Sequence, residues 1–323
     1  MKAIVQEEYG SPDVLELRDI DKPEIADDEV LVRVHAAGVG RDVWHVMTGL
    51  PYPIRLAGYG FRAPKNPVIG SDMSGVVEAL GKDVSTFQPG DEVFGIGKGS
   101  YAEYVCAGED KLAPKPANLT FEQAAVVAIM GSTALQALRD HGKVRPGQEV
   151  LVIGASGGVG TYAVQIAKAF GAHVTGVCST QKVEMVRSIG ADHVIDYTQE
   201  DFAEGDQRYD LILDIGGNSS LARLRRALAS RGTLVIVGGE SGGRWLGGTD
   251  RQLRALVLSR FVGQKLGTFI SSENHEDLLV LKELIESGKV TPVIDRMYPL
   301  SEVPEAIRYL EGGHARGKVV ITV

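Results

Sequence analysis

A glycine-rich turn near the middle of the sequence carries the clearest signal for chemistry. The stretch 150–169, VLVIGASGGVGTYAVQIAKA, begins as an apolar run that predicts a strand and continues with the spacing of an amphipathic helix. The turn between them holds Gly154, Ser156, Gly157, Gly158, Val159 and Gly160. Such a turn presents backbone N–H groups at the N-terminus of the next helix, where these groups and the helix dipole bind a pyrophosphate. We therefore predict a dinucleotide site, in which Gly157 allows close approach of the phosphates and Gly160 allows the helix to pack closely on the strand.

The spacing of these glycines departs from the usual G-x-G-x-x-G pattern by one residue, because Ala155 stands where the first glycine would be. Taken alone, the motif also fits an ordinary turn. Its place after an apolar strand and before an amphipathic helix favours the dinucleotide site. A P-loop is excluded because no Gly-Lys-Ser/Thr sequence follows.

The end of the second predicted strand indicates which dinucleotide is bound. The run HVTGVC is followed by Ser179, Thr180, Gln181 and Lys182, where many dinucleotide-binding chains carry an acid. An acid accepts hydrogen bonds from both ribose hydroxyls and repels a 2′-phosphate, whereas Ser179 and Thr180 are donors and Lys182 is a cation. This composition favours NADPH over NADH. The alternative is that Lys182 only begins the next helix in solvent.

The elements that must position these residues fall into two groups. Before residue 120 the sequence has short alternating runs such as VLVRVHAAGV, separated by turn signals, which predicts a small and mostly antiparallel β domain. After it, Thr120 and Gln123 predict the start of a long helix over 121–142, and apolar strands then alternate with amphipathic helices. Such alternation predicts a parallel sheet covered on both faces. The expected fold class is therefore α/β, with a doubly wound Rossmann sheet plus an antiparallel β domain.

Composition and charge narrow the class of partner. The 323 residues exceed the size of a single core, so two domains are expected, and the net charge of −8 argues against nucleic acid or an anionic membrane as main partner. The two cysteines are too few for a disulfide framework and suit a reducing compartment. Glu7 and Glu8 stand where a secretion signal needs apolar residues, and the most apolar stretch, 124–138, is too short to cross a bilayer. We expect a cytoplasmic protein that binds a small molecule.

With these motifs in place, the chain resembles the medium-chain dehydrogenase/reductase superfamily, and within it the zinc-free quinone oxidoreductase branch that includes zeta-crystallin. The resemblance extends from MKAIVQEEYGSPDVLEL through NPVIGSDMSGVVEALGKDVSTFQPGDEVFG to HARGKVVITV. It implies a GroES-like catalytic domain of residues 1–124 and 272–323 around a Rossmann NADP(H)-binding domain of residues 125–271. It also implies a substrate cleft between the domains and a homodimer, for which LGTFIS (266–271) would supply the contact strand.

The same resemblance implies roles for several residues in binding the cofactor. Lys182 and Tyr197 would contact the 2′-phosphate, in agreement with the charge at that position. Thr133 and Asn218 would lie near the nicotinamide, and Lys318 would lie near the phosphates. Packing in the core or in a loop is the alternative for these last three residues.

Zinc-dependent relatives take their catalytic metal ligands from three stretches, and this chain lacks most of those ligands. The matching residues are 38–42 (GVGRD), 70–72 (GSD) and 130–132 (MGS), which leaves Asp72 as a candidate, whereas a catalytic zinc needs three protein ligands. The four-cysteine lobe of those relatives is missing as well, and the histidines are scattered along the sequence. We therefore expect no metal.

Without a Lewis acid, such an enzyme is poorly equipped to stabilise an alkoxide, which disfavours oxidation of simple alcohols. A quinone or an α,β-unsaturated carbonyl spreads the charge of an incoming hydride over a conjugated system, so that hydrogen-bond donors suffice. We therefore predict an NADPH-dependent reductase of quinones, enones or enals. Tyr52, in the loop TGLPYPIRLAGYG, matches a tyrosine of the family's substrate site and would line that site or donate the proton. Gly40 stands where the family often has Asn or Asp.

Two alternatives stay open at this point. One is a 2-enoyl thioester reductase, which would need a channel and basic contacts for a long acyl carrier. The other is a non-catalytic NADPH-binding protein of the zeta-crystallin type. A short-chain dehydrogenase is excluded because Tyr162 is followed four residues later by Ile166 and not by lysine. The sequence leaves open the physiological acceptor, the proton donor and whether one or two electrons are transferred.

Overall fold

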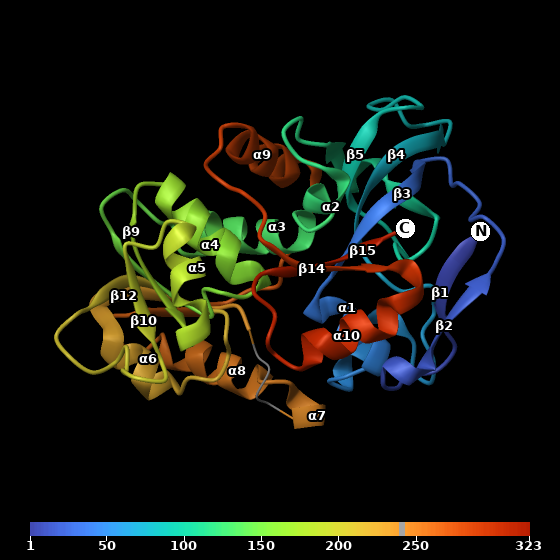
Figure 1. Ribbon diagram of the computed structural model, residues 1–323. Coiled ribbons are helices and arrows are strands. Elements are labelled where there is room, and N and C mark those ends of the chain that lie inside the picture. The colour runs from blue at the N-terminus through green and yellow to red at the C-terminus, as the bar shows by residue number, and fades with distance from the viewer. Residues whose placement is uncertain (239–242) are drawn as a thin grey trace. The chain divides into compact units, whose positions relative to one another are not determined.

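Two sheets of different kinds organise the chain, whose structure is a computed structural model (Figure 1). The structure describes residues 1–238 and 243–323. The first of two units contains residues 1–132, 273–287 and 292–323, and the second contains residues 133–272 and 288–291. Both chain ends therefore lie in the first unit, and residues 125–132, which the sequence assigned to the nucleotide-binding domain, lie there as well.

The second unit is built on a six-stranded sheet in which all neighbouring strands are parallel. The strand order is β10-β9-β8-β11-β12-β13. The strands are β8 (Glu149–Ile153), β9 (His173–Cys178), β10 (His193–Asp196), β11 (Tyr209–Asp214), β12 (Leu228–Ile236) and β13 (Lys265–Thr268). Because β8 lies in the middle and the chain proceeds outward from it first to one side and then to the other, the sheet is doubly wound, as predicted. In such sheets ligands bind at the carboxyl ends of the strands where the order reverses, which here is between β8 and β11.

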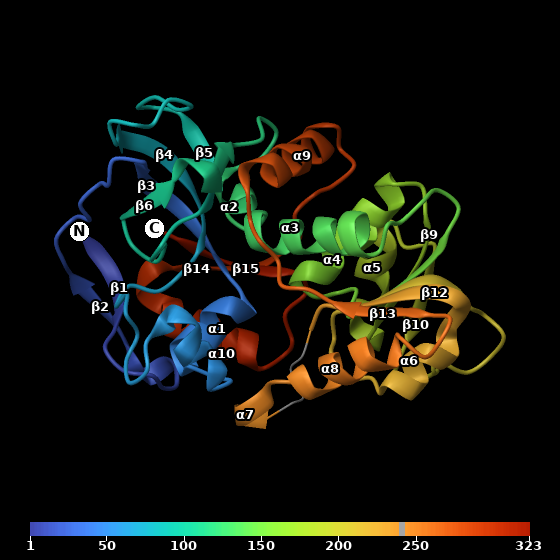
Figure 2. The same ribbon diagram turned by 180° about the vertical axis from the view of Figure 1, so that it is seen from behind.

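Helices cover both faces of this sheet because its strands are apolar on both sides. Both views show α4 and α5 on one face and α6 and α8 on the other (Figures 1 and 2). Side chains of the central strands, such as Leu151, Ile212 and Leu234, are fully buried. The helices are α4 (Gly158–Ala169), α5 (Val183–Ser188), α6 (Leu221–Ala227), α7 (Gly243–Leu246) and α8 (Thr249–Leu258).

The first unit is built on a seven-stranded, mostly antiparallel sheet, which confirms the predicted β domain. Its order is β14-β15-β3-β4-β5-β7, and β6 also pairs with β3, while β1 and β2 form a separate two-stranded sheet. The strands are β1 (Lys2–Gln6), β2 (Leu15–Asp19), β3 (Glu29–Val39), β4 (Asp72–Leu80), β5 (Glu92–Ile96), β6 (Tyr104–Gly108), β7 (Leu112–Pro114), β14 (Ile294–Pro299) and β15 (Lys318–Thr322). Pairing of β15 with β3 joins the C-terminal segment to the N-terminal one.

The helices of the first unit pack on this sheet. A cluster that includes Met47 of α1, Val303 of α10 and Val319 of β15 is buried together. The helices are α1 (Arg41–Thr48), α2 (Phe121–Ala124), α9 (His275–Glu286) and α10 (Val303–Glu311), and α3 (Ala128–Gln136) continues from this unit into the second.

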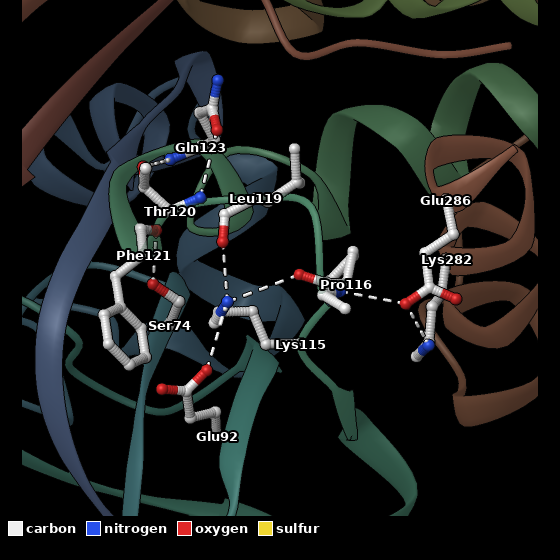
Figure 3. Close-up of polar contacts among 11 residues, drawn as sticks. Ser74, Glu92, Lys115, Pro116, Leu119, Thr120, Phe121, Gln123, Lys282 and Glu286 are labelled. Carbon is white, nitrogen blue, oxygen red and sulfur yellow. Dashed lines mark hydrogen bonds and ion pairs between the residues drawn. The ribbon is translucent and has the colours of Figure 1, made fainter. Parts of the chain in front are cut away.

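The loop that leads into α2 is held by a buried lysine (Figure 3). Lys115, whose side chain is 7% exposed, donates to the carbonyl oxygens of Leu119 (2.6 Å) and Pro116 (3.4 Å). Its Nζ also lies 3.2 Å from a carboxylate oxygen of Glu92. This ammonium therefore has an acceptor for each of its three protons.

Thr120 and Gln123 form the predicted capping box at the start of α2. The long helix predicted over 121–142 is interrupted, however, because α2 ends at Ala124 and α3 begins at Ala128. The break falls on a stretch with two adjacent valines, and β-branched residues have low helix propensity.

Candidate active site

The glycine turn lies between the carboxyl end of β8 and the start of α4. Gly157 is the N-cap of α4, and no side chain caps this helix. The N–H groups of the first three helical residues, 158–160, therefore lack the partners that a longer helix would give them. These groups point out of the positive end of the helix, which is where a pyrophosphate binds.

Packing explains one of the glycines and leaves room at another. A Cβ on Gly160 would lie 2.0 Å from the carbonyl oxygen of Gly154, so the helix can approach the turn only if this residue has no side chain. A Cβ on Gly157 would meet nothing closer than 3.5 Å among residues 1–238 and 243–323. These residues leave space beside Gly157, which suits a ligand there.

The residues predicted for the adenosine end of the cofactor come together at one edge of the sheet. Ser179 and Thr180 follow β9, Lys182 ends the short turn that starts at Thr180, and Tyr197 follows β10. The two strands are paired in parallel, and the N–H of Tyr197 donates to the carbonyl oxygen of Cys178 (3.1 Å). Hydroxyl, phenol and ammonium groups from two strands thus share this edge.

An acid at the same edge escaped the sequence reasoning. Asp196, the last residue of β10, accepts hydrogen bonds from the N–H (3.0 Å) and hydroxyl (2.8 Å) of Thr198. A hydrogen bond from Thr180 and these bonds from Thr198 hold the pKa of Asp196 below its ordinary value. The acid is therefore on the strand next to the expected one, and the parallel register of β9 and β10 was the signal that could have found it.

The loop after β11 was predicted to lie near the nicotinamide, and an unforeseen ion pair holds it. Arg251 of α8 donates to a carboxylate oxygen of Asp214 (2.5 Å), to the carbonyl oxygen of Ser219 (2.7 Å) and to that of Gly238 (3.0 Å). The other oxygen of Asp214 accepts from the N–H of Gly217 (3.2 Å). Burial raises the pKa of Asp214, and Arg251 opposes that rise.

Two residues predicted for the nicotinamide end differ in exposure. Asn218 is exposed at the tip of the loop that Arg251 holds, and Thr133, in α3, is half-buried.

Arg251 lies far from Asp214 in the sequence, so no local pattern could have revealed the pair.

Lys318, predicted for the phosphates, has a buried ammonium group in the first unit. Lys318 is 2% exposed, and its Nζ has no hydrogen-bond acceptor in the part of the chain that the structure describes. A carboxylate oxygen of Asp72, also 2% exposed, lies 3.5 Å away. Lys115 is nearly as buried and fully bonded, so the bare ammonium of Lys318 is not a general feature of buried lysines here.

Nearby charges of both signs act on the pKa of Asp72. Its other oxygen accepts from the N–H of Ile129 (2.8 Å). Burial raises the pKa of Asp72 to about 7, and the carboxylates of Asp42 and Glu273 also raise it, against the lowering effect of Lys318.

Replacing Asp72 is expected to change how stability depends on pH. An unfolded aspartate has a pKa of about 3.9, so between about pH 4 and pH 7 the folded chain retains a proton that the unfolded chain has released. The free energy of unfolding therefore falls as pH rises through this window. Asp72→Asn should remove that contribution, as measured by urea unfolding at several pH values. The exposed Asp83→Asn is the control, and parallel pH profiles for wild type and Asp72→Asn would contradict the assignment.

Tyr52 lies in a loop where its ring is close to a cationic side chain and to a second aromatic ring. The guanidinium of Arg55 lies 5.1 Å from the ring centre of Tyr52 and 4.4 Å from that of Tyr9. Tyr52 is half-buried, as expected for a residue that lines a site. Its role as lining residue or proton donor stays a prediction.

The glycine at position 40 has a local reason. A Cβ there would lie 2.1 Å from a carboxylate oxygen of Asp42 and 2.7 Å from the Cε of Met130. The carboxylate of Asp42 thus occupies the space that a side chain at position 40 would need. The same oxygen is buried without a hydrogen bond among the described residues.

Residues 1–238 and 243–323 contain no group of three or more His, Cys, Asp or Glu side chains placed to hold a metal ion. Among the same residues, no helix has the length and apolar character that a membrane crossing requires.

Comparison with known families identifies both parts of the chain. Residues 26–117 match the family described as alcohol dehydrogenase GroES-like domain, and residues 189–321 match the family described as zinc-binding dehydrogenase.

Similar proteins match over the whole chain. The mitochondrial NAD(P)H oxidoreductase RTN4IP1 of Mus musculus is 36% identical, over 100% of this chain and 89% of its own length. The chloroplastic NADPH-dependent alkenal/one oxidoreductase of Arabidopsis thaliana is 35% identical, over 99% of this chain and 79% of its own length. The solved quinone oxidoreductase of Coxiella burnetii is 32% identical, covers 100% of this chain and 99% of that one, and has a TM-score of 0.88. The chain therefore belongs to the medium-chain dehydrogenase/reductase superfamily, in its quinone oxidoreductase branch.

Proposed function

We propose that the chain is an NADPH-dependent reductase that transfers hydride to quinones or other conjugated carbonyls without zinc. The observation that carries this proposal is the carboxyl edge of the six-stranded sheet. There, the N-terminal turn of α4 and the residues with hydroxyl, phenol and ammonium side chains that follow β9 and β10 lie at the same end of the strands. The names of two relatives, an alkenal/one oxidoreductase and a quinone oxidoreductase, support the acceptor class.

The chain's own groups divide the work of holding the cofactor. In the proposal, the N–H groups of 158–160 bind the pyrophosphate, with Ser156 and Val159 in the same turn. The 2′-phosphate receives its contacts from Ser179, Thr180, Lys182 and Tyr197. Lys318 provides a further cation for the phosphates, supported by its buried ammonium, for which the described residues offer no hydrogen-bond acceptor.

Orientation of the reacting ends falls to other residues. When bound, NADPH supplies a hydride. Thr133 and Asn218 lie beside the nicotinamide in this proposal, and the ion pair of Arg251 with Asp214 keeps the loop around Asn218 in one arrangement. The negative charge left on a conjugated acceptor is delocalised, so hydrogen-bond donors are enough to stabilise it, and water or Tyr52 completes the reduction with a proton.

The residues present do not fit a catalytic zinc, although one matching family is described as zinc-binding. At the three positions from which zinc-dependent relatives take ligands, this chain has Gly40, the pair Ser71 and Asp72, and the stretch 130–132. Glycine has no donor atom, and the carboxylate of Asp72 is already engaged by an N–H and by Lys318. No step of the reaction is therefore assigned to a metal.

An acceptor screen tests this function. The purified chain should oxidise NADPH in the presence of small quinones or enones, and dialysis against a chelator should leave the rate unchanged. Turnover with 2-enoyl thioesters alone would favour a thioester reductase. Tight NADPH binding without oxidation by any acceptor would favour a non-catalytic NADPH-binding protein, and a rate that is lost on chelation and restored by zinc would contradict the proposal.

The chain also forms a homodimer in this proposal. β13 ends the order of the six-stranded sheet, so one side of it faces no other strand among the described residues. Large apolar side chains close to it in sequence are exposed, among them Phe261 (80%), Ile270 (95%) and Val257 of α8 (61%). Open strand edges and exposed apolar surface are both typical of interfaces. A second copy paired along β13 would cover them, and a monomer in analytical ultracentrifugation would contradict this.

We place the enzyme in the cytoplasm as part of the same proposal. The thiols Cys106 and Cys178 are free, which suits a reducing compartment. The mouse and Arabidopsis relatives carry mitochondrial and chloroplastic names, so fractionation of the source cells decides the question.

A further inference from the structure

The first unit contains a preformed apolar pocket of about 310 Å³. Val43 and Val46 of α1 line it together with Val68 and Ile69 of the following loop and Ile96 of β5. Val43 and Ile69 also belong to a packed core cluster, so these walls are fixed by the fold. This volume is at the lower end of the range for pockets that hold small organic ligands.

The charged side chains in the lining of the pocket, Lys65 and Lys98, are both cations. The polar side chains in its lining are Tyr59, Lys65, Asn66, Ser71 and Lys98. None of the described residues that line the pocket is acidic, although the chain as a whole has a net charge of −8. A pocket of this local sign attracts anions and disfavours cations.

The two lysines are available to a ligand. Lys65 is exposed, and its side chain makes no ion pair or hydrogen bond in the described part of the chain. Lys98 is 84% exposed, and its Nζ lies 3.6 Å from Glu29, a loose pair in solvent. Asn66 connects the backbone segments that carry the two lysines, because it donates to the carbonyl oxygen of Lys98 (3.1 Å) and accepts from the N–H of Val68 (3.1 Å).

Ser71 connects the pocket with the position of the reaction. It stands in the stretch from which zinc-dependent relatives take a histidine ligand for their catalytic metal, and it is part of the lining. We infer that this pocket selects conjugated acceptors that carry an anionic group. The apolar body of the acceptor contacts the valine and isoleucine side chains, and the anion lies at Lys65 and Lys98. This inference rests on the proposed reductase function and names its substrate class.

Paired acceptors of equal reactivity test the inference. An enone whose carboxylate is separated from the conjugated system by several saturated carbons differs from its methyl ester in one charge and has nearly the same intrinsic reactivity, and a 2-enoyl thioester of coenzyme A carries its anions as phosphates. Wild type should prefer the free acid over its ester by roughly 3- to 10-fold in kcat/KM, and the preference should fade at high salt. Lys65→Gln with Lys98→Gln should abolish the preference, because kcat/KM for the free acid falls to that for the ester. Lys82→Gln, an exposed lysine paired with Asp27 outside the pocket, is the matched control and should keep the preference.

The same variants distinguish an acceptor whose anion is its own carboxylate from one whose anion is the phosphate of a carrier. A lysine-dependent preference confined to the thioester would support an anionic acceptor whose charge comes from a phosphorylated carrier. Equal kcat/KM for acid and ester in wild type, or a preference that survives in the double variant, would overturn the inference.

Direct binding separates this inference from the proposed function. The saturated ketone that corresponds to this carboxylate-bearing enone has no conjugated double bond to reduce, and its binding can be measured by calorimetry whether or not the chain turns over. Binding that weakens roughly 3- to 10-fold in the double variant and not in Lys82→Gln would support the pocket even if no acceptor were reduced. Turnover of neutral quinones together with unchanged binding of this anion in the double variant would leave the reductase function standing and reject the pocket's selectivity.

Discussion

Arg251→Met is expected to lower the free energy of unfolding by about 3–5 kcal/mol, because it leaves the carboxylate of Asp214 buried without its cation. Asp214 is fully buried, and its pKa is raised even with Arg251 present, so burial already outweighs the attraction. Removing the guanidinium also takes away the hydrogen bonds that the carbonyl oxygens of Ser219 and Gly238 accept from it. Urea unfolding followed by circular dichroism measures the loss.

The pH dependence of this loss provides an internal check. Without Arg251 the pKa of Asp214 should rise further, so the carboxyl binds a proton in the folded variant at pH values where the unfolded chain has released it. The deficit of the variant should therefore shrink as pH falls. Arg254→Met is the control on the same helix, since Arg254 is 76% exposed, pairs with Asp250 at 3.6 Å, and should change stability by less than about 1 kcal/mol. Equal losses for Arg251→Met and Arg254→Met would show that the buried pair does not hold the loop.

The sheets were predictable because their signals are local and repeated. Apolar strands that alternate with amphipathic helices predict a parallel sheet, and the alternating runs before residue 120 predict an antiparallel one. The long helix expected over 121–142 failed at Ala124, since in a segment that is buried all round the apolar spacing no longer distinguishes a continuous helix from a broken one.

The candidate site was predictable where its residues follow a strand and not where they meet by folding. The glycine turn directly follows β8 and the run 179–182 directly follows β9, so their position after two predicted strands was enough. Asp196 and Arg251 interact with residues that are distant in sequence. Asp196 lies on β10, which pairs with β9, and Arg251 of α8 contacts Asp214 at the end of β11. The bare ammonium of Lys318 is likewise a property of packing, because nothing in the sequence distinguishes it from the fully bonded Lys115.

Lys182→Ala is expected to weaken binding of NADPH by about 1–3 kcal/mol, roughly 5- to 150-fold in Kd, while it leaves NADH almost unchanged. The reason is that NADPH alone carries the 2′-phosphate for which Lys182, Ser179 and Thr180 are proposed as partners. Asp196 makes the prediction sharper, since its lowered pKa keeps a negative charge at the same edge of the sheet. Asp196→Asn should therefore act in the opposite direction and improve NADPH relative to NADH. Fluorescence titration measures the affinities of wild type and both variants for each cofactor.

Arg187→Ala separates contact from general charge, because Arg187 is a cation of the adjoining helix α5 whose guanidinium is paired with Glu184 (2.8 Å). Its removal changes the net charge as much as removal of Lys182 does, but its guanidinium is already paired with Glu184 and exposed to solvent, so it should weaken NADPH less than Lys182→Ala does. Lys182→Arg keeps the cation and should retain the preference for NADPH. Equal weakening of NADPH and NADH by Lys182→Ala, or an effect of Arg187→Ala as large as that of Lys182→Ala, would show that the 2′-phosphate is held elsewhere.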